Sequence, residues 1–201
     1  MRLFWEQGYD ATGVADLTRA MGITPPSLYA AFGGKEELFR RAVDRYVAGP
    51  ARHLAEALMR PTAREAAEDL LRGMVALAAG DGTPHGCMTV QGALAASGRG
   101  RGARDDLAAR RRQGEALLAA RFAQAGPGEL SAGQDAAAVA RYVFAVSFGL
   151  AVQAAGGATA AELHEAVDVA LSGWPAPPPD AAGGGHAWVS PPSTTSSAPL
   201  T

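Results

Sequence analysis

No stretch of this sequence alternates apolar and polar residues over the length of a β-strand. Its apolar residues are mainly alanine and leucine, and isoleucine occurs only once, at Ile23. Because alanine and leucine favour helices whereas alternating β-branched residues favour strands, the pattern predicts an all-α fold. Hydrophobic residues make up 48% of the 201 positions, so the chain can bury a substantial core.

Local start and stop signals divide the chain into a series of helices. Thr62-Ala63-Arg64-Glu65 and Thr159-Ala160-Ala161-Glu162 are capping boxes, in which a hydroxyl and a carboxylate satisfy backbone N–H groups of the first turn. Gly49-Pro50 should kink or break the helix that begins near residue 35. The predicted helices span about 2–7, 13–20, 25–31, 35–59, 63–79, 87–96, 102–124, 134–155 and 160–172.

Residues 12–32 contain two short helices separated by a tight turn. In the first, Thr12 can act as the N-cap, and Gly22 falls where the helix must end and the chain reverse. In the second, Thr24 can cap the helix, and Pro25 fits a first-turn position that needs no N–H group. This arrangement predicts a helix-turn-helix.

The second of these helices has a small and unobstructed N-terminal half. Leu28 and Phe32 lie four residues apart and can pack back onto the first helix. The other side then carries Pro25, Pro26, Ser27, Tyr29 and Ala30. Such a helix can enter the major groove of DNA, which is about 12 Å wide.

The same region resembles the DNA-binding head of the tetracycline-repressor (TetR) family of transcriptional regulators. The matching residues follow the order and spacing of that family: Phe4, Gly8-Tyr9, Thr12, Val14, Met21-Gly22-Ile23, Ser27-Leu28-Tyr29, Phe32 and Lys35-Glu36-Glu37-Leu38-Phe39. The resemblance implies that the helix opened by Thr24 reads DNA and that Tyr29 and Lys35 contact phosphates. The expected DNA-binding residues are Thr12, Thr24, Pro25, Pro26, Ser27, Tyr29 and Lys35.

Each phosphate contact has an alternative explanation. Tyr29 can be a partly buried packing residue, and Lys35 can be an ordinary solvated charge, although the positive end of a helix dipole disfavours a lysine there. The family also begins with a full first helix and a basic arm, whereas this sequence starts at Met1-Arg2-Leu3-Phe4. We therefore expect a shortened first helix and one phosphate contact fewer.

The rest of the helical body resembles the ligand-binding and dimerisation domain of the family. The helix 135–155 is apolar on nearly all sides, and with the helix 160–172 it can form a symmetric four-helix interface of a homodimer. Small residues that permit close approach are Ala145, Ser147, Gly149 and Ala151. The alternative is an internal core helix of a monomer.

We divide the chain into three parts on this basis. Residues 1–45 form the DNA-binding head, residues 46–173 form the ligand-binding and dimerisation body, and residues 174–201 form a Pro/Gly/Ser-rich tail that should be disordered, Trp188 included. A ligand cavity among the body helices should be lined by Met74, Met88, Phe122, Tyr142, Phe144 and Phe148.

Other chemistry has little support in the sequence. His85 and Cys87 do not complete a metal site, because the other histidines fall in separate segments, and no base is evident for Cys87. We expect no metal, no cofactor and no enzymatic activity. A single cysteine fits a reducing compartment, and no uninterrupted apolar stretch is long enough to cross a bilayer, so we expect a cytoplasmic protein.

We therefore predict a ligand-responsive transcriptional regulator. It would act as a homodimeric repressor that an unidentified small-molecule effector releases from a palindromic, double-stranded DNA operator. A first alternative is a truncated, DNA-incompetent helical dimer that still binds ligand. A second is an enzyme built around His85 and Cys87.

Overall fold

The structure, a computed structural model, describes residues 1–94 and 100–175. In this part of the chain all regular secondary structure is helical, which confirms the all-α prediction. The helices are α1 (Arg2–Ala11), α2 (Val14–Met21), α3 (Pro25–Phe32), α4 (Lys35–Ala48), α5 (His53–Ala57), α6 (Ala63–Ala79), α7 (Met88–Leu94), α8 (Arg101–Phe122), α9 (Ala136–Ala155) and α10 (Ala160–Ser172).

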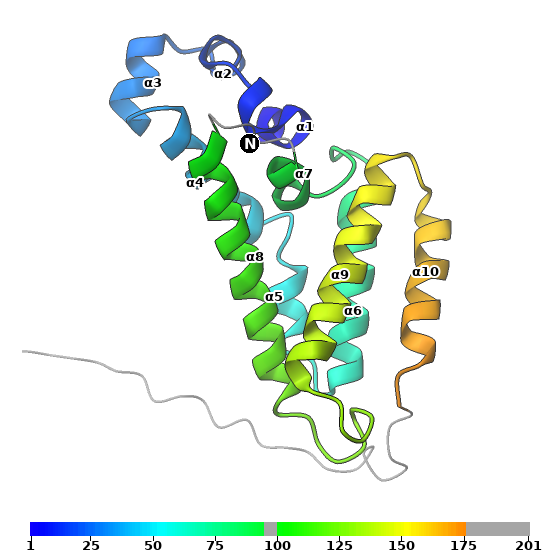
Figure 1. Ribbon diagram of the computed structural model, residues 1–201. Coiled ribbons are helices and arrows are strands. Elements are labelled where there is room, and N and C mark those ends of the chain that lie inside the picture. The colour runs from blue at the N-terminus through cyan, green and yellow to red at the C-terminus, as the bar shows by residue number, and fades with distance from the viewer. Residues whose placement is uncertain (95–99, 176–201) are drawn as a thin grey trace, which may run out of the picture.

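Helices α1–α3 and the start of α4 form a head at one end of the molecule (Figure 1). The body below it consists of α5–α10, and the long helix α8 runs from the underside of the head to the far end. In the body, α9 packs mainly against α6 and α8, and α10 lies against α6 and α9. Helix α7 fills the junction between α1 and α8.

The break predicted at Gly49-Pro50 is present, since α4 ends at Ala48 and α5 begins only at His53. Helix α1 is longer than predicted and reaches Ala11 instead of ending near residue 7. It does so across a kink at Gly8, where φ is 76° and ψ is 177°. A residue without a side chain adopts this conformation at little cost, so the helical path resumes after the kink.

Thr12 does not cap α2, so that prediction is wrong. The residue is completely buried, and its hydroxyl donates a hydrogen bond of 2.6 Å to the carbonyl oxygen of Gly8. The N-cap of α2 is Gly13, whose N–H donates to the carboxylate of Asp16 at 3.2 Å. Because its hydroxyl is already engaged at the end of α1, Thr12 cannot serve the next helix.

Aromatic side chains join the head to the body. Within the head, the ring of Phe4 packs edge-on against Phe39 with centroids 5.1 Å apart. At the junction, Trp5 packs edge-on against Tyr46 at 4.8 Å, and its indole N–H donates to the carbonyl oxygen of Gly86 at 3.1 Å. Phe4, Trp5, Phe39 and Tyr46 are all buried, so the head has its own core and is fixed to the body through a continuous apolar contact.

Trp174, the first residue of the predicted tail, packs against the body. It is half-buried, its ring lies 5.6 Å from that of Phe122, and its indole N–H donates to the carbonyl oxygen of Glu129 at 2.9 Å. Residues 176–201, with Trp188, lie outside the described part of the chain.

Helix α9 is the one helix in the described residues that is long and apolar enough to cross a membrane by length and composition. The sequence prediction excluded such a span, and every window of 18 residues in α9 includes Arg141. One side of α9 packs against α6 and α8. The opposite side is exposed and also mainly apolar.

Candidate nucleic-acid interface and internal cavity

Helix α3 begins on a well-formed cap at the surface of the head. The hydroxyl of Thr24 accepts the N–H of Ser27 at 3.4 Å and lies 2.9 Å from the hydroxyl of Ser27. The preceding Gly22 has φ 65°, a left-handed conformation that favours glycine and reverses the chain between α2 and α3. The predicted cap and turn are both confirmed.

The N-terminal half of α3 faces solvent. Leu28 is completely buried and anchors the helix, whereas the neighbouring positions are exposed: Pro25, Pro26, Ser27, Tyr29, Ala30 and Ala31. None of these side chains carries a charge, so the surface is small and neutral with one aromatic ring. Pro25 and Pro26 have no N–H group and the N–H of Ser27 is bonded to Thr24, so this first turn leaves no backbone donor of its own unpaired.

The phosphate-contact candidates lie in different environments. The ring of Tyr29 is 52% exposed, which leaves it available at the surface instead of packed in the head. Lys35 is half-buried, and its Nζ lies 4.2 Å from the ring centroid of Tyr9. Burial lowers the pKa of Lys35, and the nearby Asp10 opposes this shift. Lys35 is thus a positioned cation on an aromatic face and differs from a freely solvated charge.

The body contains a cavity of about 280 Å³ lined by residues of α4, α5, α6, α7, α8 and α9, and exposed lining residues on α4 and α8 leave it partly open to solvent. Met74, Phe144 and Phe148, three of the six residues expected around a ligand, line this cavity. The other three lie elsewhere. Met88 and Phe122 are buried in the core outside it, and Tyr142 is half-exposed on the outer side of α9.

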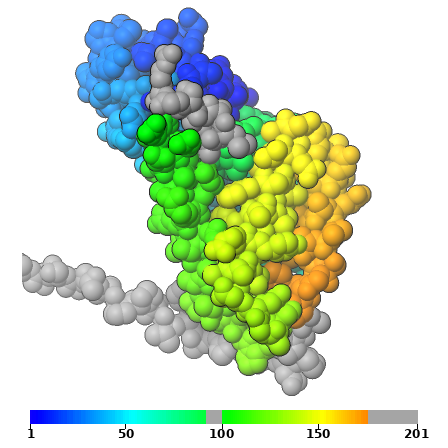
Figure 2. Space-filling view, in the orientation of Figure 1, coloured from blue at the N-terminus to red at the C-terminus, as the bar shows by residue number. Residues whose placement is uncertain are grey.

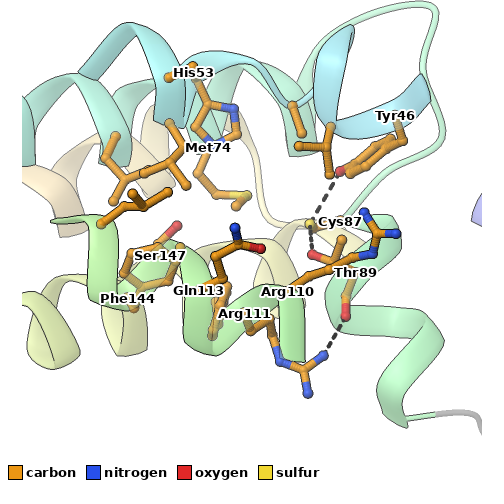
Figure 3. Close-up of a pocket in the computed structure, with 18 of the residues that line it drawn as sticks. Tyr46, His53, Met74, Cys87, Thr89, Arg110, Arg111, Gln113, Phe144 and Ser147 are labelled. Carbon is orange, nitrogen blue, oxygen red and sulfur yellow. Dashed lines mark hydrogen bonds between the residues drawn. The ribbon is translucent and has the colours of Figure 1, made fainter. Parts of the chain in front are cut away.

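Three uncharged polar side chains enter the cavity (Figure 3). Ser147 is 1% exposed, and its hydroxyl has no hydrogen-bond partner in the described structure. His53 projects from α5, its Nδ1 is buried without a partner, and burial lowers its pKa to about 4. The amide of Gln113 points toward the space between them from α8.

Two arginines line the cavity, and only Arg110 is paired with carboxylates among the described residues. Arg110 pairs with Asp44 at 2.7 Å and with Asp106 at 2.9 Å. Arg111 donates a hydrogen bond of 2.7 Å to the carbonyl oxygen of Thr89, and Figure 3 shows its guanidinium directed away from His53 and Ser147.

Cys87 lies at one end of the cavity wall, beside Tyr46 and Thr89. The hydroxyl of Tyr46 donates to the Cys87 sulfur at 3.2 Å and accepts the N–H of Met88 at 3.3 Å, and burial raises the pKa of Tyr46. The hydroxyl of Thr89 lies 3.1 Å from the same sulfur. Within residues 1–94 and 100–175, no group of three or more histidine, cysteine or acidic side chains is placed to hold a metal ion.

Sequence reasoning missed His53, Ser147 and Gln113 as cavity residues. Ser147 had a usable signal, because it falls among buried positions of α9 at helical spacing, with Phe144 and Ala151. His53 and Gln113 had none, since their approach depends on how α5 and α8 pack. The set predicted for close approach also divides: Ser147 and Ala151 face the interior of the subunit, whereas Ala145 and Gly149 face outward.

The outer face of α9 carries a stripe of exposed and mainly apolar residues, namely Ala138, Tyr142, Ala145, Gly149 and Val152. A Cβ atom at Gly149 would meet no atom within 4 Å. Figure 2 shows α9 and α10 side by side on one surface of the body. Val169 of α10 is also 74% exposed. Exposed apolar residues gathered on one helix face are typical of a protein contact surface.

A capped, exposed helix on a three-helix head, joined to a helical body with a ligand-sized cavity, defines a helix-turn-helix transcriptional regulator. The family profile described as "Bacterial regulatory proteins, tetR family" matches residues 1–42. The chain is 30% identical over 178 residues to the HTH-type transcriptional repressor ComR of Escherichia coli (strain K12), covering 87% of this chain and 85% of that protein. This chain belongs to the TetR family of DNA-binding regulators.

Solved structures of TetR regulators have the same fold. The TetR family transcriptional regulator CifR, as a cysteine mutant complexed with a 26-base-pair double-strand operator, superposes with a TM-score of 0.81 at 39% identity. That match covers 87% of this chain and 92% of CifR. A putative TetR regulator from Rhodococcus sp. RHA1 is 47% identical, with a TM-score of 0.60 and coverage of 87% and 94%.

Proposed function

We propose that this protein represses transcription by binding a palindromic operator as a homodimer, and that a small molecule in the body cavity releases it. The observation that carries this proposal is the exposed, unobstructed N-terminal half of α3. A helix of this size, held by the buried Leu28, fits the major groove. The operator complex of CifR and the repressor activity in the name of ComR support the same assignment.

The proposed DNA-binding residues are those of α3 and its flanks. Thr24, Pro25, Pro26 and Ser27 would face the base edges and the adjacent backbone, whereas Tyr29 and Lys35 would contact phosphates. Thr12 is left out of this set, because its buried hydroxyl is bonded to Gly8. Residues 1–45 would act as the reading head, and the body from residue 46 would hold the ligand and the partner subunit.

The proposed dimer contact is the outer face of α9 with α10. Its exposed small and apolar residues let two copies approach closely around a twofold axis. Such a dimer would have to hold its two α3 helices about 34 Å apart to reach successive major grooves. We further propose that the protein acts in the cytoplasm and catalyses no reaction.

Helix α4 would couple ligand to DNA. Lys35 at its start contacts Tyr9 of the head, whereas Tyr46 and Val47 near its end line the cavity. A molecule that changes the packing around Tyr46 would therefore tilt α4 and alter the separation of the two reading heads.

The direct test is a gel-shift titration with the DNA upstream of the protein's own coding sequence. We expect a complex that persists in the presence of excess unrelated DNA. The logarithm of its binding constant should fall linearly with the logarithm of the salt concentration. The alternative of a DNA-incompetent dimer that still binds ligand predicts no specific complex at any salt concentration, so that result would overturn our proposal.

A further inference from the structure

The geometry of the cavity points to an uncharged, mainly apolar ligand that carries one hydrogen-bonding oxygen, which the hydroxyl of Ser147 receives. This inference rests on the proposed ligand-responsive function, and it specifies the chemical class of the effector.

Ser147 is the central observation. A serine inside a helix usually bonds back to a carbonyl oxygen one turn earlier, or points to solvent. Ser147 does neither, because it is 1% exposed and its oxygen has no partner in the described structure. Figure 3 shows this hydroxyl directed toward the side chains that enter the cavity from α5 and α6. A buried hydroxyl without a partner is costly, so a ligand oxygen at this point would gain a bond that the protein leaves unmade.

His53 supports the same ligand from the opposite wall. Its ring enters the cavity from α5, and its Nδ1 is also buried without a partner. Burial lowers its pKa to about 4, with Glu56 acting in the opposite direction, so the ring is neutral at pH 7. A neutral imidazole offers one donor and one acceptor but no charge.

The charges around the cavity disfavour an ionic ligand beside Ser147. No aspartate or glutamate is among the described residues that line the cavity, so an ammonium group would find no counter-ion. Of the two lining arginines, Arg110 is paired with two carboxylates, whereas Arg111 keeps its charge but donates to a backbone carbonyl and points away from Ser147 and His53. A carboxylate beside Ser147 would therefore lose hydration without a cation directed at it.

The volume indicates the size of molecule that would fill the cavity. An apolar cavity of about 150 Å³ holds a single benzene ring. The cavity here has about 280 Å³, roughly twice that, and Phe144, Phe148 and Met74 provide apolar walls. A fused two-ring compound with one hydroxyl therefore matches the space and the polarity.

The test uses four probes of one size and different chemistry: 2-naphthol, naphthalene, 2-naphthoate and 2-naphthylmethylamine. Binding to the full chain is measured by titration calorimetry at pH 7. We expect 2-naphthol to bind about tenfold more tightly than naphthalene, which corresponds to one hydrogen bond, and the two ions to bind much more weakly.

Ser147→Ala separates a ligand contact from a structural role. It should lower the affinity for 2-naphthol about tenfold to the level of naphthalene, leave naphthalene unchanged, and leave the melting temperature unchanged or higher, because an unpaired buried hydroxyl is removed. Ser131→Ala, in the loop between α8 and α9, is the matched control and should change neither affinity.

Three outcomes overturn the inference. They are tighter binding of either ion than of 2-naphthol, equal affinities of wild type and Ser147→Ala for 2-naphthol, and failure of 2-naphthol to bind at millimolar concentration. No DNA is present in these titrations, so their result is independent of the gel shift. Specific DNA binding with preference for 2-naphthoate would reject the ligand class and keep the repressor. The expected order of probe affinities without a specific DNA complex would support the ligand class and reject the repressor.

Discussion

The head and the body present their candidate sites in opposite ways. In the head, the candidate residues lie along one exposed helix, and Thr24, Pro25 and Ser27 lie within four consecutive positions of the sequence. In the body, the cavity residues come from α4, α5, α6, α7, α8 and α9 and meet only after packing. A surface site built on one element can be recognised from local signals, whereas a cavity between helices depends on the whole tertiary arrangement.

The largest expected effect tests whether the body works only as a pair of subunits. Gly149→Glu places a carboxylate on the outer face of α9, where the subunit itself leaves room for it. In the proposed twofold contact this charge would be buried twice without a partner. We expect a folded monomer that no longer binds a palindromic operator, measured by light scattering and circular dichroism.

Ala109→Glu is the control for this variant, because Ala109 is exposed on α8 outside the proposed contact. It should remain dimeric. A Gly149→Glu protein that is also a stable dimer would show that another surface pairs the subunits.

The second effect is confined to the head. Ser27→Trp adds a large ring to the exposed first half of α3 without touching the buried Leu28. We expect operator affinity to fall by at least about a hundredfold while helicity and dimer formation stay unchanged, because the ring blocks entry into the groove. Ser131→Trp, in a loop of the body, should bind as wild type does. Full operator affinity of the Ser27 variant would mean that a different surface reads DNA.

A third effect belongs to the body alone and concerns acid stability. His53 has a pKa lowered to about 4 by burial, compared with about 6.5 in the unfolded chain. The unfolded state therefore binds the proton first, and the free energy of unfolding should fall as pH drops from about 6.5 to about 4, by about 2–3 kcal/mol. Urea titrations across this range should show a smaller loss for His53→Phe. An identical loss in both proteins would assign the acid sensitivity to other groups.

The smallest effect returns to the head. If Lys35 contacts phosphate, Lys35→Ala should weaken binding equally for all DNA sequences and reduce the slope of log K against log salt by about one unit. The loss of its contact with Tyr9 should cost no more than about 1 kcal/mol of stability. Arg52→Ala, an exposed and ion-paired position on the body, should leave the slope unchanged. A slope equal to that of wild type would show that Lys35 does not contact the DNA phosphates.

The sequence predicted features that depend on neighbouring residues better than features that depend on tertiary packing. Caps and turns depend on neighbours in the chain, so Thr24, Thr62 and Thr159 were assigned correctly as N-caps. Thr12 was assigned wrongly, because the kink at Gly8 places its hydroxyl against a carbonyl that no local pattern identifies. Aromatic residues of similar hydrophobicity lie in different environments. Phe144 lines the cavity, Phe122 packs against Trp174, and Tyr142 faces outward, and only tertiary packing distinguishes these positions.

The aromatic junction between Trp5, Tyr46 and residues 86–88 has a thermodynamic consequence. The hydroxyl of Tyr46 holds Cys87 and Met88, and Tyr46 and Cys87 are also wall residues of the cavity. If a ligand lowers the affinity for the operator through these shared residues, operator binding must lower the affinity for the ligand by the same factor. The protein bound at its operator would then respond only at a higher effector concentration than the free protein. Coupling through the junction would therefore set the effector concentration at which the protein leaves its operator.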